Sequence, residues 1–128
     1  MGAVMPEALA AWTELRHDIP GLGLLSVTSP NLLHRGWTKA QAARWGGKRE
    51  PSHIERLLSR LAPRAGLVTI ADAAPASLSW IGGVLGNRVA PLGVDKFGQT
   101  GDLPDLYAAY RLDGAAITEA VAELLLPA

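Results

Sequence analysis

The residues best placed to bind a ligand or a partner form one glycine-flanked loop, and they are Asp95, Phe97, Gly98, Thr100 and Gly101. The loop follows a short apolar run and precedes an amphipathic pattern, so it lies where a strand's carboxyl end meets the start of a helix. Ligands usually bind there in open α/β sheets. Its amides can hold a carboxylate or a phosphate, while Phe97, the only phenylalanine, can pack into another subunit. We expect an interface loop first and an anion site second.

Other residue types with catalytic potential lack the partners that catalysis needs. Asp72 and Asp95 each follow an apolar run, where we expect them to cap helices. His17, His34 and His53 have no second ligand or carboxylate at a suitable spacing, so we expect polar surface residues. We therefore predict no catalytic residue, no metal ligand and no cofactor-binding residue in this chain.

Basic residues are concentrated between positions 34 and 64. They are Arg35, Lys39, Arg44, Lys48, Arg49, Arg56, Arg60 and Arg64, against Glu50 and Glu55, which gives a local charge of +6. Trp37 and Trp45 lie among them and can stack on bases. Docking to protein is favoured over nucleic acid, because the pI is 6.8 and the cations are spaced as solvent faces of helices.

The remaining pattern alternates helices and strands. Helices are expected at 5–17, after Ser29–Pro30, from Pro75 to about 86, and in two segments after 103, with Asp113 as the cap of the last. Thr38-x-x-Gln41 and Ser52-x-x-Glu55 both fit the capping box. Apolar runs at 22–28, 67–71 and 88–94 predict strands. We predict an α/β fold, a three-layer α/β/α sandwich around a small, mostly parallel mixed sheet.

Length and composition limit the number of domains and the class of protein. With 128 residues, the chain is expected to form a single domain, 1–128. The absence of cysteine excludes disulfides and thiolate metal sites. No apolar run approaches the ~20 residues that cross a bilayer, and no secretory signal is recognisable. A cytoplasmic protein that does not enter the membrane is expected.

Three stretches resemble the carboxy-terminal domain of the transketolase superfamily of thiamine-diphosphate enzymes. Ser26-Val27-Thr28-Ser29 resembles its strand and turn ending in VTS, and Leu92 to Gly101 resembles its GxDxFGxS segment, with Thr100 in place of the serine. The tail from Leu103 to Leu125 resembles its last two helices. Within the superfamily, the chain is most similar to the homodimeric decarboxylating component of pyruvate dehydrogenase.

This resemblance implies a non-catalytic domain of a larger 2-oxoacid dehydrogenase, one that supports a homodimer. Thiamine diphosphate and Mg²⁺ would bind elsewhere in the full-length enzyme, because the superfamily's Gly-Asp-Gly…Asn motif is absent here. The implied partners are the remaining domains and a lipoyl-bearing acyltransferase core. The resemblance also implies a sheet without its first strand, or one whose first strand comes from the preceding domain.

Two other functions stay open at this point. One is the corresponding domain of a transketolase, which moves two-carbon units between sugars. The other is a stand-alone module that binds a small ligand or a nucleotide through the loop after Val94.

Overall fold

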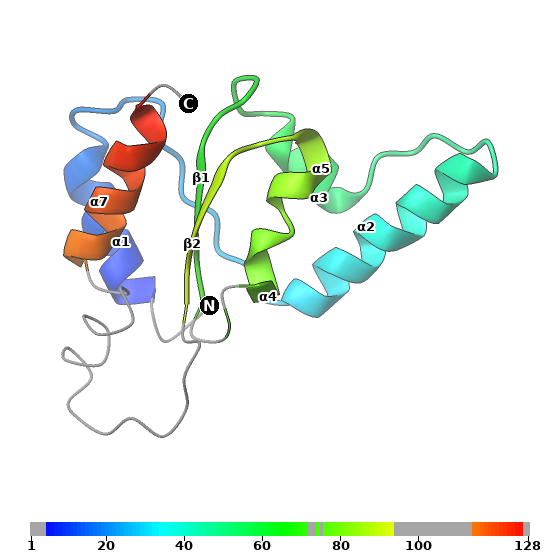
Figure 1. Cartoon of the computed structure of the whole chain (residues 1–128), viewed down its shortest axis with the longest axis horizontal. Helices are drawn as coiled ribbons and strands as arrows, with labels where there is room; N and C mark the ends of the chain where they lie inside the picture. The colour runs from blue at the N-terminus through cyan, green and yellow to red at the C-terminus, as the bar shows by residue number, and fades with distance from the viewer. Residues whose placement is uncertain (1–4, 72–73, 75, 94–113, 127–128) are drawn as a thin grey trace.

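The computed structural model describes residues 5–71, 74, 76–93 and 114–126 (Figure 1). Its elements are α1 Met5–Leu15, α2 Pro30–Trp45, α3 His53–Leu58, β1 Leu67–Ile70, α4 Ala76–Ser79, α5 Gly82–Leu85, β2 Val89–Leu92 and α7 Gly114–Leu125. None of the described helices is long and apolar enough to cross a membrane.

The sheet that the structure describes has two parallel strands, β1 and β2, with Leu67 paired to Val89 and Ile70 to Leu92. The Ala71 N–H extends the ladder by donating to the Leu92 carbonyl at 3.0 Å. The connection between the strands carries α4 and α5, which is the βαβ arrangement that parallel strands require.

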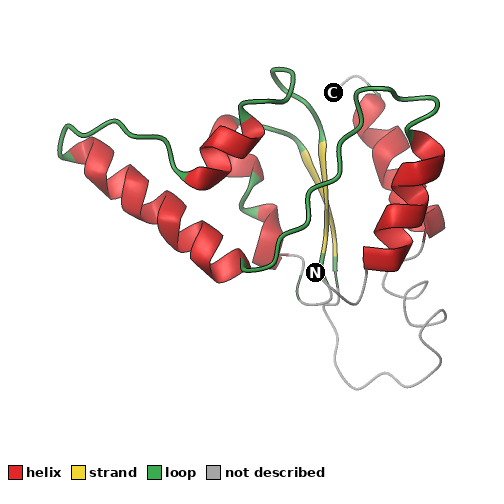
Figure 2. Cartoon of the chain, turned by 180° about the vertical axis from the view of Figure 1, so that it is seen from behind, coloured by secondary structure: helices red, strands yellow, loops and turns green. Residues whose placement is uncertain are grey.

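Helices cover both faces of this strand pair. Figures 1 and 2 show α1 and α7 on one side and α2 to α5 on the other. Side chains of successive strand residues point to opposite faces, so Val68 and Ile70 pack toward α1 and α7, while Leu67 and Ala71 pack toward the other helices. The predicted α/β class with a small parallel sheet is confirmed at this level.

The predicted strand at 22–28 is wrong in the described structure, where these residues form no ladder (Figure 2). They lead from α1 toward α2 as an extended connection. An apolar run fits either a strand or an extended segment lying on a surface, and only a hydrogen-bonded neighbour makes it a strand. No such neighbour is present among the described residues.

Two helix predictions also need correction. Thr38 does not begin a helix, because α2 runs without a break from Pro30, and the Thr38 hydroxyl instead donates to the Arg35 carbonyl at 3.1 Å. The helix expected from Pro75 to about 86 is divided into α4 and α5 by a turn at Trp80 and Ile81.

The break between α4 and α5 precedes two glycines, which have low helix propensity. A Cβ at Gly82 would collide with the Val89 side chain and lie 2.9 Å from the Asn87 carbonyl oxygen, so α5 can approach β2 only with glycine there. Gly86 has a φ of 79° and ends α5, as expected from its position.

Candidate functional site

The sequence-predicted site residues Asp95, Phe97, Gly98, Thr100 and Gly101 lie outside the described residues, and so does Asp72. The interface or anion role of that loop therefore stays a prediction. The basic segment, by contrast, is described in full, and it carries the features that follow.

A shallow groove of about 330 Å³ lies where the connection after α1 meets α2 and α3. It is lined mainly by apolar side chains and by backbone: Leu25, Ser26, Val27, Thr28, Ser29, Leu32, Leu33, Gly36, His53 and Leu57. Its volume is near the lower end of the range for ligand pockets, about 300–1,000 Å³. Such a groove takes a few apolar side chains.

The backbone on one side of this groove has no hydrogen-bond partner in the described part of the chain. Among the described residues, Gly23–Thr28 neither donate nor accept a hydrogen bond through backbone or side chain. The Leu22 carbonyl just before them accepts from the Trp12 indole at 2.8 Å, and the Ser29 carbonyl just after accepts from the Leu33 N–H at 3.1 Å. The segment is thus fixed at both ends and available along its length.

Large apolar side chains are exposed around the groove. Leu24 is 40% exposed, Leu25 50% and Leu32 61%. Single exposed apolar residues are ordinary, but two exposed leucines that line one groove, Leu25 and Leu32, favour a binding surface.

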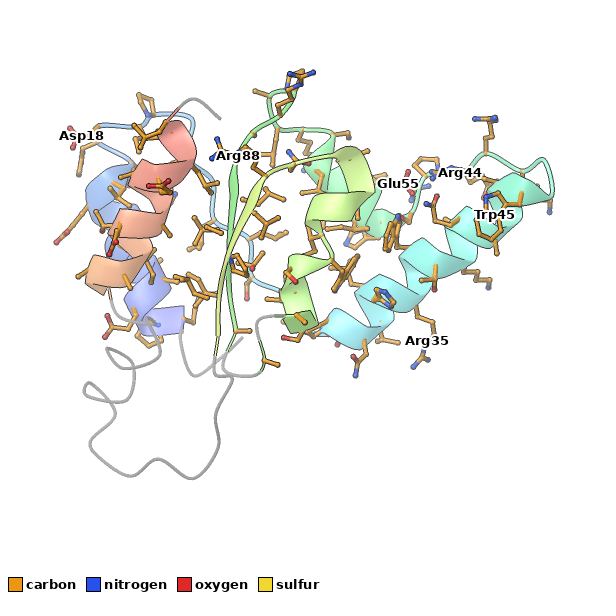
Figure 3. The ribbon with its side chains drawn as sticks, viewed as in Figure 1. Asp18, Arg35, Arg44, Trp45, Glu55 and Arg88 are labelled. Carbon is orange, nitrogen blue, oxygen red and sulfur yellow. The ribbon has the colours of Figure 1, made fainter. Side chains whose placement is uncertain are left out.

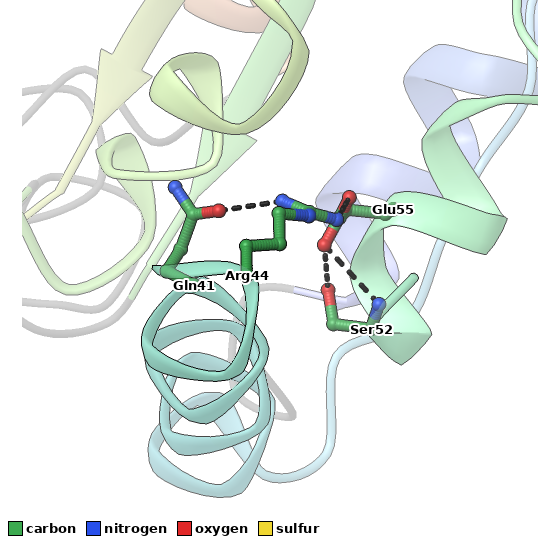
Figure 4. A network of polar contacts seen from close by, with 4 residues as sticks. All are labelled: Gln41, Arg44, Ser52 and Glu55. Carbon is green, nitrogen blue, oxygen red and sulfur yellow. Dashed lines mark hydrogen bonds and ion pairs between the residues drawn. The ribbon is translucent and has the colours of Figure 1, made fainter. Parts of the chain in front are cut away.

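A polar network holds α3 against α2 beside this surface (Figure 4). Arg44 of α2 donates to Gln41 at 2.5 Å and forms an ion pair with Glu55 of α3. Glu55 also accepts a hydrogen bond from the Ser52 N–H at 3.1 Å, which is its half of the predicted capping box, and a second from the Ser52 hydroxyl at 2.8 Å.

The contacts in this network lower the pKa of the Glu55 carboxyl. Burial raises its pKa, but hydrogen bonds from Ser52 and Arg44 and the positive charge of Arg44 outweigh burial. The pKa therefore lies below its ordinary value of 4.5. The network joins α2 to α3 at neutral pH, because the ionised Glu55 carboxylate accepts from Ser52 and pairs with Arg44 of the other helix.

Three aromatic rings join α2 to the turn after α4. Trp37 stacks on Trp80 with ring centroids 5.4 Å apart, and His34 meets the Trp80 ring edge-on at 4.8 Å. Trp37, which the sequence suggested as a base-stacking group, is therefore half-buried in the core. Trp45, at the end of α2, is 89% exposed.

The remaining cations of the basic segment face solvent without carboxylate partners. Arg44–Glu55 is the one ion pair in the part of the chain that the structure describes, which leaves Arg35, Lys39, Lys48, Arg49, Arg56, Arg60 and Arg64 exposed. Figure 3 shows Arg35, Arg44 and Trp45 along α2, far from Asp18 at the other end of the molecule. Exposed cations are thus concentrated on α2, α3 and the adjoining loops, as their positions in the sequence indicate.

His17, His34 and His53 are all exposed, as predicted, and only His53 lines the groove. No cluster of three His, Asp or Glu side chains in the described ranges can hold a metal ion. The groove has an apolar floor, exposed cations nearby and backbone groups without a hydrogen-bond partner in the described structure, and these features suit the binding of a partner. His53 is the one titratable side chain in its lining.

The sequence interpretation did not identify this groove. A usable signal was present, because Gly21-Leu22-Gly23-Leu24-Leu25 combines strand composition with two glycines. Glycine weakens strand interiors and often marks a place where another backbone approaches closely.

Comparison with known families, curated proteins and solved structures gives no match for this chain.

Proposed function

We propose that this chain is a non-catalytic assembly domain that acts by contacting other protein. The observation that carries this proposal is the segment Gly23–Thr28, whose backbone has no hydrogen-bond partner among the described residues. The side chains of Leu24 and Leu25 within it, and of Leu32 in α2, are exposed. A free-standing protein normally pairs or covers such a segment, since an unpaired strand-like edge recruits other chains. In an assembly, the neighbour supplies the missing partner.

The enzyme we propose for this domain is a thiamine-diphosphate-dependent 2-oxoacid dehydrogenase of the homodimeric pyruvate dehydrogenase type. Support comes from the VTS and GxDxFGxT-like segments of the sequence. The parallel strand pair with helices on both faces has the layering that a transketolase-type carboxy-terminal domain requires. In that setting, residues 22–28 would take the place of a further strand.

Within such an enzyme, the chain would support the dimer, contact the remaining domains and stand near a lipoyl-bearing acyltransferase core. Thiamine diphosphate and Mg²⁺ would be held by another part of the enzyme, because this sequence lacks the Gly-Asp-Gly…Asn motif. A cytoplasmic location follows from the same proposal.

The test compares the full-length enzyme that carries this chain with a form from which the chain is removed. Sedimentation velocity should show a dimer that weakens on removal, and pyruvate decarboxylation should be lost with it. Transfer of two-carbon units between sugar phosphates, without pyruvate turnover, would assign the domain to a transketolase. The chain alone should neither turn over pyruvate nor bind thiamine diphosphate with Mg²⁺ tightly in calorimetry.

Calorimetry also distinguishes the assembly function from the alternative function of a stand-alone ligand-binding module. Titration of the chain with nucleotides and inorganic phosphate should give no saturable heat. Micromolar binding that Gly98→Val abolishes would overturn the assembly role in favour of that module.

A further inference from the structure

We infer that Gly23–Thr28 and the adjoining groove bind an extended, acidic segment of another protein, which adds as a strand along this backbone. This inference deepens the proposed assembly function, on which it rests, by naming the surface and the chemistry of its partner.

The backbone supplies the first argument. The amides and carbonyls of Gly23–Thr28 have no partner in the described structure, and the segment is held at Leu22 and Ser29. An extended peptide laid beside it can form main-chain hydrogen bonds without displacing any existing bond. This is the mode of recognition called β-strand addition.

The groove supplies the second argument. Leu25 and Val27 of the segment, Leu32 and Leu33 of α2, and Leu57 of α3 line it. Alternate side chains of an added strand point the same way, so every second residue of the peptide can enter this apolar floor.

The surrounding charge identifies the partner as acidic. Lys39 follows the lining residue Gly36 by three positions, and Arg56 follows the lining residue His53 by three, so each shares a helix face with the groove. Both are exposed and lack a carboxylate partner within the described residues. Carboxylates on the peptide would neutralise them and set its direction.

Other occupants fit less well. In a two-fold contact the same patches meet, so a second copy would bring a second region of charge +6 against the first. A nucleic acid matches the cations, but it has no peptide main chain to form a strand ladder along Gly23–Thr28. An acidic and apolar polypeptide satisfies both features.

Fluorescence anisotropy with three labelled probes tests this: a short peptide of alternating valine and glutamate, its valine–lysine counterpart, and a single-stranded oligonucleotide. Only the glutamate peptide should bind saturably below about 1 mM. Equal or tighter binding of the lysine peptide or the oligonucleotide overturns the inference, as does the absence of saturable binding by the glutamate peptide.

Matched variants separate the contribution of the backbone to peptide binding from that of the cations. Ser26→Pro removes one free N–H and should weaken peptide binding about tenfold or more, whereas Ser26→Ala keeps the N–H and should bind as the parent does. Circular dichroism verifies that both variants fold. Equal binding by the two excludes strand addition.

The charge reversal K39E/R56E should also weaken binding about tenfold or more, against less than about threefold for K48E/R49E, which makes the same change in net charge outside the groove lining. Equal losses would show a general electrostatic attraction and overturn the site. Self-association that protects residues 23–28 without peptide would assign the groove to a second copy. Neither result decides the proposed assembly function, which the sedimentation and turnover experiments test separately.

Discussion

Replacing Glu55 by glutamine should lower the free energy of unfolding by about 1–2 kcal/mol at pH 7. Glutamine keeps an oxygen that can accept from Ser52, and it is a usual third residue of a capping box. What it loses is the bond with Arg44, because its amide group opposes the guanidinium with another donor. Hydrogen bonds to charged groups contribute about 1.5–3 kcal/mol and neutral ones about 0.5–1.5.

The burial of the Arg44–Glu55 pair supports the expected loss of about 1–2 kcal/mol in the free energy of unfolding. The side chains of Arg44 and Glu55 are 28% and 10% exposed, so the pair lies between surface ion pairs, worth about 0–1 kcal/mol, and fully buried ones. Glu55→Ala also removes the capping box and should cost about 1 kcal/mol more than Glu55→Gln. A double-mutant cycle with Arg44→Met should return a coupling of about 1–2 kcal/mol.

The assay is urea denaturation followed by tryptophan fluorescence over a series of pH values. Since folding lowers the pKa of Glu55, its contribution is complete above 4.5 and is lost as the pH falls through the lowered value. The stability difference between the parent and Glu55→Gln should therefore shrink in acid. A glutamine variant as stable as the parent at pH 7 would refute the reasoning, and so would a stability difference that does not shrink as the pH falls below 4.5.

Three further outcomes are expected. Gly82→Ala should cost about 1–3 kcal/mol in urea unfolding, because its Cβ meets Val89 and the Asn87 carbonyl. Gly83→Ala, whose Cβ would lie 4.0 Å from the Trp37 ring, should leave stability within about 0.5 kcal/mol, and equal effects of the two would contradict the close approach of α5 to β2. Ile54→Ala should cost about 2–5 kcal/mol by the same measurement because Ile54 is fully buried, and a loss below about 1 kcal/mol would place it outside the core. Trp45→Phe should remove the tryptophan emission that acrylamide quenches most and change stability by less than about 0.5 kcal/mol, since Trp45 is 89% exposed. Acrylamide quenching equal to that of the parent would show that the Trp45 indole is covered.

Local patterns predicted the elements whose causes are local. Pro30 begins α2 as expected from its fixed φ, and the Ser52 and Glu55 pair begins α3, because both signals act within one helical turn. The apolar runs that contain Leu67 and Val89 were also predicted as strands, and they are strands because each is the hydrogen-bonded neighbour of the other.

Features that depend on contacts between distant parts of the chain were not predicted from the sequence. Whether residues 22–28 pair depends on a neighbouring strand, which the segment itself does not encode. Thr38 has a capping-box spacing, but the favourable continuation of α2 outweighs it. Arg44 looked like one of eight equivalent surface cations, and only the packing of α3 on α2 pairs it with Glu55.

Amide hydrogen exchange at residues 23–28 tests the central claim most directly, with the chain measured alone and with the valine–glutamate peptide. The account predicts rapid exchange in the free chain, because these amides have no acceptor among residues 5–71, 74, 76–93 and 114–126. It predicts clear protection when the peptide binds. Protection of the same amides in the free chain, or exchange unaltered by bound peptide, would contradict the claim that this segment receives a partner strand.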